Sequence, residues 1–194
     1  MARLVSILGS VIGDEFPAVL VAAQDGREAA FATLWRDGNP ALLRYLRVIA
    51  PDDAEDVAAE VWVHVVRGLP GFRGDEQAWR AWLFTTTRRR ASDERRRRSR
   101  HPVAPLIELP GDLEPRTEDA AVLALENMAT AAAIAAVSAL PPLQAEVILL
   151  RVLAGLDTET VACIVRRSPG AVRVAAHRGL RRLAQTLTSA EVTL

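Results

Sequence analysis

Apolar residues recur every three to four positions along most of the chain, and no segment sustains the strict alternation of a half-buried strand. Asp25-Gly26 marks a break within the first helix, and Pro40 fits the first turn of the second. The predicted helices cover 17–35, 40–49, 51–66, 75 into the arginine run, 121–139, 142–153, 157–165 and 169–187. On the third, Val57, Val61, Val65 and Trp62 are expected to face inward. We therefore predict an all-α fold.

Residues 101–120 differ from the rest because prolines stand among acidic side chains. Proline breaks helices, and like charges keep a chain extended, so this composition is typical of a linker. The chain is thus expected to comprise two helical domains, at 13–100 and 121–188, joined by an acidic Pro-rich linker at 101–120.

Charge is segregated along the chain although its formal net charge is zero. Residues 61–100 carry 11 Arg against four acids and residues 161–194 carry six against one, whereas residues 1–60 and 101–160 are acidic. All 24 basic residues are Arg, whose planar guanidinium matches phosphate and guanine edges. Sorted charges of this kind indicate charged partners rather than a particular fold.

The sequence lacks the motifs that are typical of enzymes, metal sites and membrane proteins. The chain has one cysteine, Cys163, three histidines that are not at metal-binding spacing, and no Gly-rich phosphate loop. We therefore expect no enzyme, no metal and no cofactor. No apolar run reaches the ~18 residues of a membrane span, and Asp14 and Glu15 interrupt the only stretch that resembles a signal peptide. The sequence thus predicts a cytoplasmic protein without membrane insertion.

The second basic block predicts a helix-turn-helix over 158–183. Ser168 suits an N-cap and Pro169 the first helical position. An apolar stripe on the second helix is expected to comprise Val172, Ala176, Leu180 and Leu183, leaving an arginine-rich face for a DNA major groove. Arg173 is the candidate for a base edge, and the candidates for phosphates are Arg166, Arg167, Arg178 and Arg182. An ordinary helical pair with a solvated basic face, and with His177 in no special role, is the alternative.

The first basic block joins aromatic residues to arginines. Phe72, Trp79, Trp82 and Phe84 precede the runs Arg88–Arg90 and Arg95–Arg98. A cationic track beside rings that stack on bases is how proteins hold single-stranded nucleic acid. However, Trp79, Trp82 and Leu83 also have the spacing of core residues, and the arginines could form a solvated tail.

An acidic stretch over 52–60 cannot face nucleic acid. It either ends a helix in solvent or binds a basic protein surface.

The residues quoted above resemble a known family. DAEDVAAEVW at 53–62 with AWLFTTTRRRASDERR at 81–96 resembles region 2 of the sigma-70 type initiation factors of bacterial RNA polymerase, in the extracytoplasmic-function group. LPPLQAEVILLRVLAGL at 140–156 with GAVRVAAHRGLRRL at 170–183 resembles region 4. The order and the intervening linker match as well, and the resemblance covers about four-fifths of the chain.

The resemblance implies a sigma factor that directs promoter-specific transcription initiation. It implies binding of the β′ clamp helices of core polymerase through Asp53, Glu55, Asp56 and Glu60. It implies contact with the melted −10 element through Arg73, Trp79, Thr86, Arg88, Arg89, Arg90, Arg95 and Arg96. The −35 contacts that it implies are Arg166, Arg167, Ser168, Gly170, Arg173, Val174, His177 and Arg178. Region 4 would also touch the β flap, and members of the group are often held inactive by an anti-sigma factor.

Three positions depart from the family pattern. Arg89 stands where Asn is usual, which changes the expected −10 contact, and Ala59 replaces a Gln that could hydrogen-bond to polymerase. Arg166 stands where the turn of the helix-turn-helix usually has Gly, so it is strained if its φ is positive.

The main alternative function is a helix-turn-helix regulator that acts without binding core polymerase. Such a protein would use only its C-terminal module and bind palindromic duplex DNA as a dimer.

Overall fold

The computed structural model describes residues 12–100 and 131–191, and side chains as far as 186. The predicted linker at 101–120 and the start of the Ala-rich helix lie outside these residues, whereas 131–138 is helical. Throughout the described part the regular structure is helical, as predicted, and none of its helices has the length and hydrophobicity to cross a membrane.

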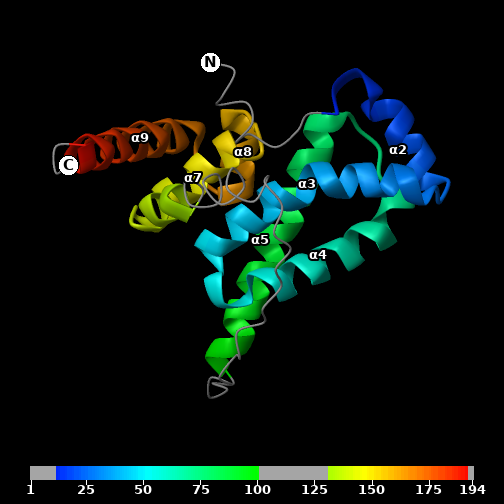
Figure 1. Cartoon of the computed structure of the whole chain (residues 1–194), viewed down its shortest axis with the longest axis horizontal. Helices are drawn as coiled ribbons and strands as arrows, with labels where there is room; N and C mark the ends of the chain where they lie inside the picture. The colour runs from blue at the N-terminus through cyan, green and yellow to red at the C-terminus, as the bar shows by residue number, and fades with distance from the viewer. Residues whose placement is uncertain (1–11, 101–130, 192–194) are drawn as a thin grey trace, which may run out of the picture.

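The helices form two units (Figure 1). The N-terminal unit comprises η1 (Gly13–Glu15), α2 (Phe16–Gln24), α3 (Glu28–Ile49), η2 (Pro51–Asp53), α4 (Ala54–Gly68), η3 (Leu69–Gly71) and α5 (Glu76–Arg100). The C-terminal unit comprises residues 131–138, α7 (Pro142–Val152), α8 (Thr158–Val165) and α9 (Pro169–Glu191). In Figure 1, α2 and α9 lie at opposite sides of the molecule.

The N-terminal unit is built around aromatic rings. Tyr45 and Phe84 pack edge to face with centroids 5.5 Å apart, and Trp79 lies between Phe16 and Phe72. The predicted inward residues of α4, namely Val57, Val61, Trp62 and Val65, are all buried. Burial of such large apolar surfaces is the main stabilising term for this unit.

Helix α3 differs from the prediction. The expected break at Asp25-Gly26 is confirmed, with Gly26 at φ 81°, but Pro40 lies inside α3 rather than in the first turn of a new helix. Pro40 is exposed, and residues on both sides of it, such as Leu34 and Tyr45, are buried in the same core. Tertiary packing on both sides of Pro40 thus stabilises a continuous helix, although proline disfavours the interior of a helix.

The C-terminal unit has an aliphatic core in which α9 packs closely on α7. Val172, Ala175 and Gly179 form the buried face of α9. A Cβ at Gly179 would lie 2.5 Å from Ile148 Cδ1 and 3.3 Å from Gln144 Cβ, so a larger residue here requires the buried Ile148 side chain to move. The expectation that Leu180 belongs to the buried stripe is wrong: its side chain is 54% exposed.

The two units also contact each other, α3 with α7 and α5 with α8. Most of their buried residues belong to one continuous hydrophobic cluster, and Leu140, Ala145 and Ile148 form a second one. The structure therefore shows the two units docked together.

Candidate nucleic-acid and protein-binding surfaces

The helix-turn-helix is formed by α8 and α9, as predicted. Asp157 caps α8 by accepting a hydrogen bond from the Thr160 amide at 2.7 Å, and this bond lowers the pKa of the Asp157 carboxyl. Ser168 Oγ accepts from the Ala171 amide at 3.2 Å at the start of α9, where Pro169 is the first residue. Between them Arg166 adopts φ 55°, so the strain expected of a non-glycine residue at this turn is present.

The predicted −35 contacts all lie on solvent-exposed positions of this motif. They are Arg166, Arg167, Ser168, Gly170, Arg173, Val174, His177 and Arg178. Arg173 approaches Glu159 at 3.4 Å, but both side chains are more than 60% exposed, so this pair is weak. The arrangement leaves the first turns of α9 open to a ligand.

Helix α5 changes character along its length. Its N-terminal half enters the core, and Trp79 and Thr86 are buried, at 0% and 7% exposed. Trp79 and Thr86 are expected to contact a melted strand, but in this structure both side chains are buried and cannot do so. Their spacing in the sequence could equally belong to a core, and core packing is what the structure shows.

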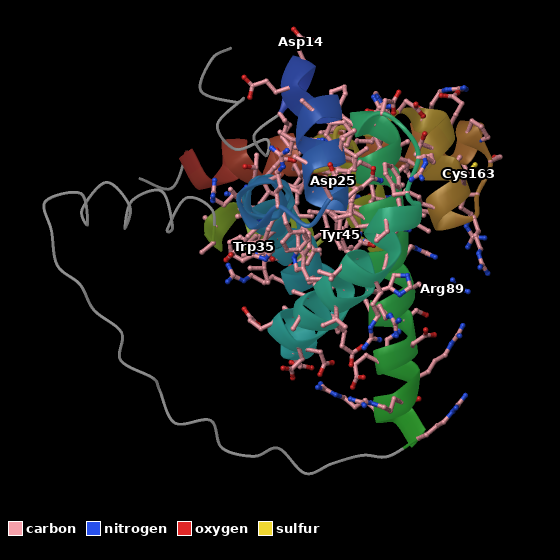
Figure 2. All side chains as sticks on the ribbon, turned by 90° about the vertical axis from the view of Figure 1, so that its right-hand side faces the viewer. Asp14, Asp25, Trp35, Tyr45, Arg89 and Cys163 are labelled. Atoms are coloured by element: carbon pink, nitrogen blue, oxygen red, sulfur yellow. The ribbon has the colours of Figure 1, made fainter. Side chains whose placement is uncertain are left out.

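The C-terminal half of α5 carries the basic residues (Figure 2). Arg89, Arg95 and Arg96 are exposed, and Arg89 lies at the solvent side of α5 in Figure 2. Arg90 is half-buried, with Nη2 3.4 Å from His64 Nδ1. Arg88 is also half-buried, and its Nε donates to Glu146 of α7 at 2.6 Å. Burial lowers the pKa of Arg88, but the contact with Glu146 outweighs this effect, so the net shift is upward.

Acidic residues neutralise the end of the basic helix. Arg97 pairs with Glu94 at 2.8 Å, and Arg96 pairs with Asp93 at 3.7 Å. Arg98 contacts Asp52 and Asp53 of η2, immediately before α4. The pair of Arg96 with Asp93 is weak because both side chains are more than half exposed, so carboxylates offset chiefly Arg97 and Arg98.

The loop that precedes α5 is held by a residue that the sequence does not single out. Gln24 Nε2 donates to the carbonyls of Leu69 and Phe72, each at 2.9 Å. Arg73 Nη1 donates to the carbonyls of Pro70 and Phe72. The Phe72 and Trp82 rings stack with centroids 5.3 Å apart, and both are half-buried. This pair, rather than Trp79, offers partly accessible ring surface beside Arg73.

The acidic face of α4 is open at three of its four predicted positions. Glu55, Asp56 and Glu60 are exposed, and Glu55 has only a 3.5 Å contact with Arg47. Asp53 is mostly covered, because Arg98 lies against it. Burial, reinforced by Glu94, Asp52 and Asp56, raises the pKa of Asp53 despite the opposing effect of Arg98. The structure thus leaves Asp53 paired within the chain.

A buried polar network joins α3 to α5. Arg80 Nη2 donates to Asp37 at 3.2 Å and to Glu76 at 3.1 Å, and Glu76 accepts hydrogen bonds from the amides of Ile12 and Gly13. Burial raises the pKa of Asp37 to about 6; Arg80 opposes this effect and Glu76 adds to it. The network anchors residues 12–13 to the start of α5. Within the described ranges, no cluster of His, Cys, Asp and Glu side chains could hold a metal ion.

Two family models match the chain. Residues 34–101 match the model of sigma-70 region 2, and residues 130–183 match that of sigma-70 region 4. The chain is 34% identical over 177 residues to the ECF RNA polymerase sigma factor ShbA of Streptomyces griseus, covering 86% of this chain and 92% of ShbA. The chain belongs to the extracytoplasmic-function sigma factors.

Other relatives agree with this assignment. The sigma factor SigD of Mycobacterium tuberculosis is 30% identical over 186 residues, covering 92% of this chain and 86% of SigD. BldN of Streptomyces coelicolor is 30% identical over 168 residues, covering 85% of this chain and 63% of BldN. This sigma factor thus directs transcription initiation by RNA polymerase and is not an enzyme. The alternative of a regulator that acts without polymerase is set aside.

Solved structures share the fold. CnrH, in complex with the cytosolic domain of CnrY, superposes with a TM-score of 0.58 at 21% identity, covering 91% of this chain and 99% of CnrH. RpoE of Bartonella quintana, in complex with the anti-sigma factor NepR, gives a TM-score of 0.57 at 22% identity, covering 81% of this chain and 96% of RpoE.

Proposed function

We propose that this sigma factor divides promoter recognition between its two basic helices and binds core polymerase through α4. The observation that carries this assignment is the exposure of three surfaces: the start of α9, the end of α5 and the acidic face of α4, of which the last two meet where Arg98 contacts Asp52 and Asp53. Sigma factors bind core polymerase and promoter DNA, and these surfaces have the charges that the two partners require.

The start of α9 is the proposed −35 surface. A helix with an exposed N-terminal half that follows a tight turn fits the major groove, and backbone phosphates would be held by arginines around the turn. Arg173 is exposed on the second turn of α9, where its guanidinium could contact a guanine edge bidentately. The region 4 unit would also touch the β flap.

The end of α5 and the loop before it form the proposed −10 surface. Arg89, Arg95 and Arg96 provide positive charge, and the half-buried Phe72 and Trp82 rings lie near the helix start. Unpaired bases stack on such rings while arginines hold the backbone. Arg73, exposed on the loop, would lie where the strand enters.

The acidic face of α4 is the proposed docking surface for the β′ clamp helices. Glu55, Asp56 and Glu60 are exposed, and their charge excludes this face from contact with DNA. An anti-sigma factor would inhibit the protein by covering these same surfaces. RpoE of Bartonella quintana, which shares this fold, forms a complex with the anti-sigma factor NepR, and this supports binding of an anti-sigma factor.

Reconstituted transcription tests the core-binding assignment. The full chain, added to sigma-free core polymerase on a random promoter library, is expected to yield specific transcripts. The double substitution Asp56→Lys with Glu60→Lys is expected to weaken core binding about tenfold or more, because it reverses two exposed charges at the interface. The matched control is Asp14→Lys with Glu15→Lys, which reverses two exposed acids away from α4. Unchanged affinity of the α4 variant would exclude this face.

Base preference tests the assignment of α9. Arg173→Ala is expected to change the preferred −35 sequence in a promoter selection, and to cost about 1–3 kcal/mol at the base that it contacts. Arg182→Ala, whose side chain donates to Gln144 at 3.1 Å, is expected to weaken binding uniformly. Equal losses on every sequence for both variants would contradict these roles.

A further inference from the structure

The contact between the two units is centred on a single carboxylate. Glu146 Oε1 of α7 accepts a hydrogen bond from the Tyr45 hydroxyl of α3 at 2.9 Å and one from Arg88 Nε of α5 at 2.6 Å. The Glu146 side chain is 13% exposed and Tyr45 is fully buried. One residue of the C-terminal unit thus bridges two helices of the N-terminal unit.

Apolar contacts surround this bridge. Val48 of α3 packs against the cluster of Leu140, Ala145 and Ile148 in the C-terminal unit. Helix α8 also lies against α5. Hydrogen bonds to a charged group in such a partly dry contact are stronger than neutral ones, and losing one partner leaves a polar group uncompensated.

The bridge occupies Arg88, which borders the proposed −10 surface and is one of the −10 contacts that the family resemblance implies. Arg88 immediately precedes Arg89 and Arg90 on α5, and its guanidinium is engaged by Glu146. A carboxylate at this position would repel a DNA phosphate that approached Arg88. In the docked arrangement the C-terminal unit therefore both covers part of α5 and places negative charge beside it.

We propose that Glu146 is a latch that holds this sigma factor in a closed state, in which Arg88 is withheld from the melted promoter strand. The C-terminal unit must release Arg88 and Tyr45 before the −10 surface is complete. A ligand that binds the open state shifts the population toward that state. Because the wild-type chain is mostly closed, it binds single-stranded DNA more weakly than a chain without the latch does. The role of Arg88 rests on the function proposed above, but the closed state itself does not.

A distance measurement tests the closed state without DNA. Cys163, the single cysteine, is exposed on α8, and Asp25→Cys adds an exposed label site on the N-terminal unit (Figure 2). Spin labels on the full chain are expected to give a narrow distance distribution. Glu146→Gln in the same background is expected to broaden the distribution and add longer distances. Glu28→Gln, which removes an exposed charge from the start of α3, is the matched control and is expected to leave it narrow.

Two further variants keep this test decisive. Tyr45→Phe removes only the hydroxyl hydrogen bond and is expected to broaden the distribution less than Glu146→Gln does, while circular dichroism confirms folding. The charge swap Arg88→Glu with Glu146→Arg is expected to restore the narrow distribution that Arg88→Glu alone loses. A narrow distribution in every variant would overturn the latch.

Binding of a single strand tests the consequence for function. The probe is a fluorescent pool of random single-stranded 15-mers. Glu146→Gln is expected to bind it about threefold tighter than wild type, whereas Glu28→Gln, with the same change in net charge, should match wild type. Transcription by saturated holoenzyme should be equal for wild type and Glu146→Gln. A lower yield from Glu146→Gln would place Glu146 in a holoenzyme contact and contradict the latch, whereas failure of wild type to support transcription would contradict only the proposed function.

Discussion

The two arginine-rich helices differ in what surrounds their charges. On α5, Arg88, Arg96, Arg97 and Arg98 each pair with a carboxylate. On α9, Arg173 has one weak, solvent-exposed pair, and Arg178 and Arg181 have no ion-pair partner among the described residues. A count of arginines therefore overstates the positive charge that α5 offers: the start of α9 is open, whereas part of the charge on α5 is paired within the chain.

The two units also pack by different means. All nine aromatic residues lie at or before Phe84, so the N-terminal unit fills its core with rings. The C-terminal unit has none and instead brings helices close through small residues such as Ala175 and Gly179. The close contact of α9 with α7 depends on the absence of a side chain at Gly179.

The largest effect is expected where that close contact is broken. Gly179→Leu would place side-chain atoms into the space held by Ile148 and Gln144, and we expect it to destabilise the protein by about 3 kcal/mol in urea unfolding followed by circular dichroism. Leu180→Ala, one residue later but exposed, is expected to change stability by less than about 0.5 kcal/mol. The opposite ranking would show that Leu180 belongs to the core.

Gly179 and Leu180 mark the limit of what a sequence pattern predicts about structure. Local chemistry predicts local features correctly: Gly26 at the helix break, Ser168 and Pro169 at the start of α9, and the inward valines of α4. Those features depend on backbone preferences and on the period of one helix. The apolar pattern of α9 fits Leu180 as well as Gly179, and only the neighbouring helix decides between them.

Features made by distant residues could not be predicted from the sequence. Glu146 lies 101 residues from Tyr45 and 58 from Arg88, and Gln24 holds carbonyls 45 and 48 residues away. Likewise, the pairing of Asp53 with Arg98 couples two segments that the sequence assigns to different partners. Periodicity carries no information about such contacts, which tertiary packing creates.

The second prediction concerns the polar network, which is built only in the N-terminal unit. Burial raises the pKa of Asp37 to about 6, so the folded protein holds this proton more tightly than the unfolded chain does. The stability that Asp37 contributes is therefore present at low pH and is lost as the pH rises through about 6. Between pH 4.5 and 7 wild type should lose about 2 kcal/mol relative to Asp37→Asn in urea unfolding. Parallel pH profiles would contradict this role.

The third prediction concerns the strained turn, which lies only in the C-terminal unit. Arg166 is the one non-glycine residue with positive φ in the described ranges. Arg166→Gly is expected to stabilise the protein by about 1 kcal/mol, because glycine has no Cβ to clash in the left-handed region. Arg167→Gly is the control. It raises the conformational entropy of the unfolded chain without relieving strain in the folded protein, so it should be neutral or destabilising. Stabilisation by both would point to a cause other than φ.

The smallest effect tests the contrast between the two basic helices directly. Glu94 is 15% exposed and lies 2.8 Å from Arg97, whereas Glu159 is 68% exposed and lies 3.4 Å from Arg173. Glu94→Gln is expected to tighten binding of a random single-stranded pool about twofold to threefold, because it frees an arginine that is now neutralised. Glu159→Gln should change duplex binding by less than about twofold, because that pair is already screened by solvent. Both variants lose one negative charge, so equal gains would mean that net charge, and not local pairing, sets the availability of the arginines.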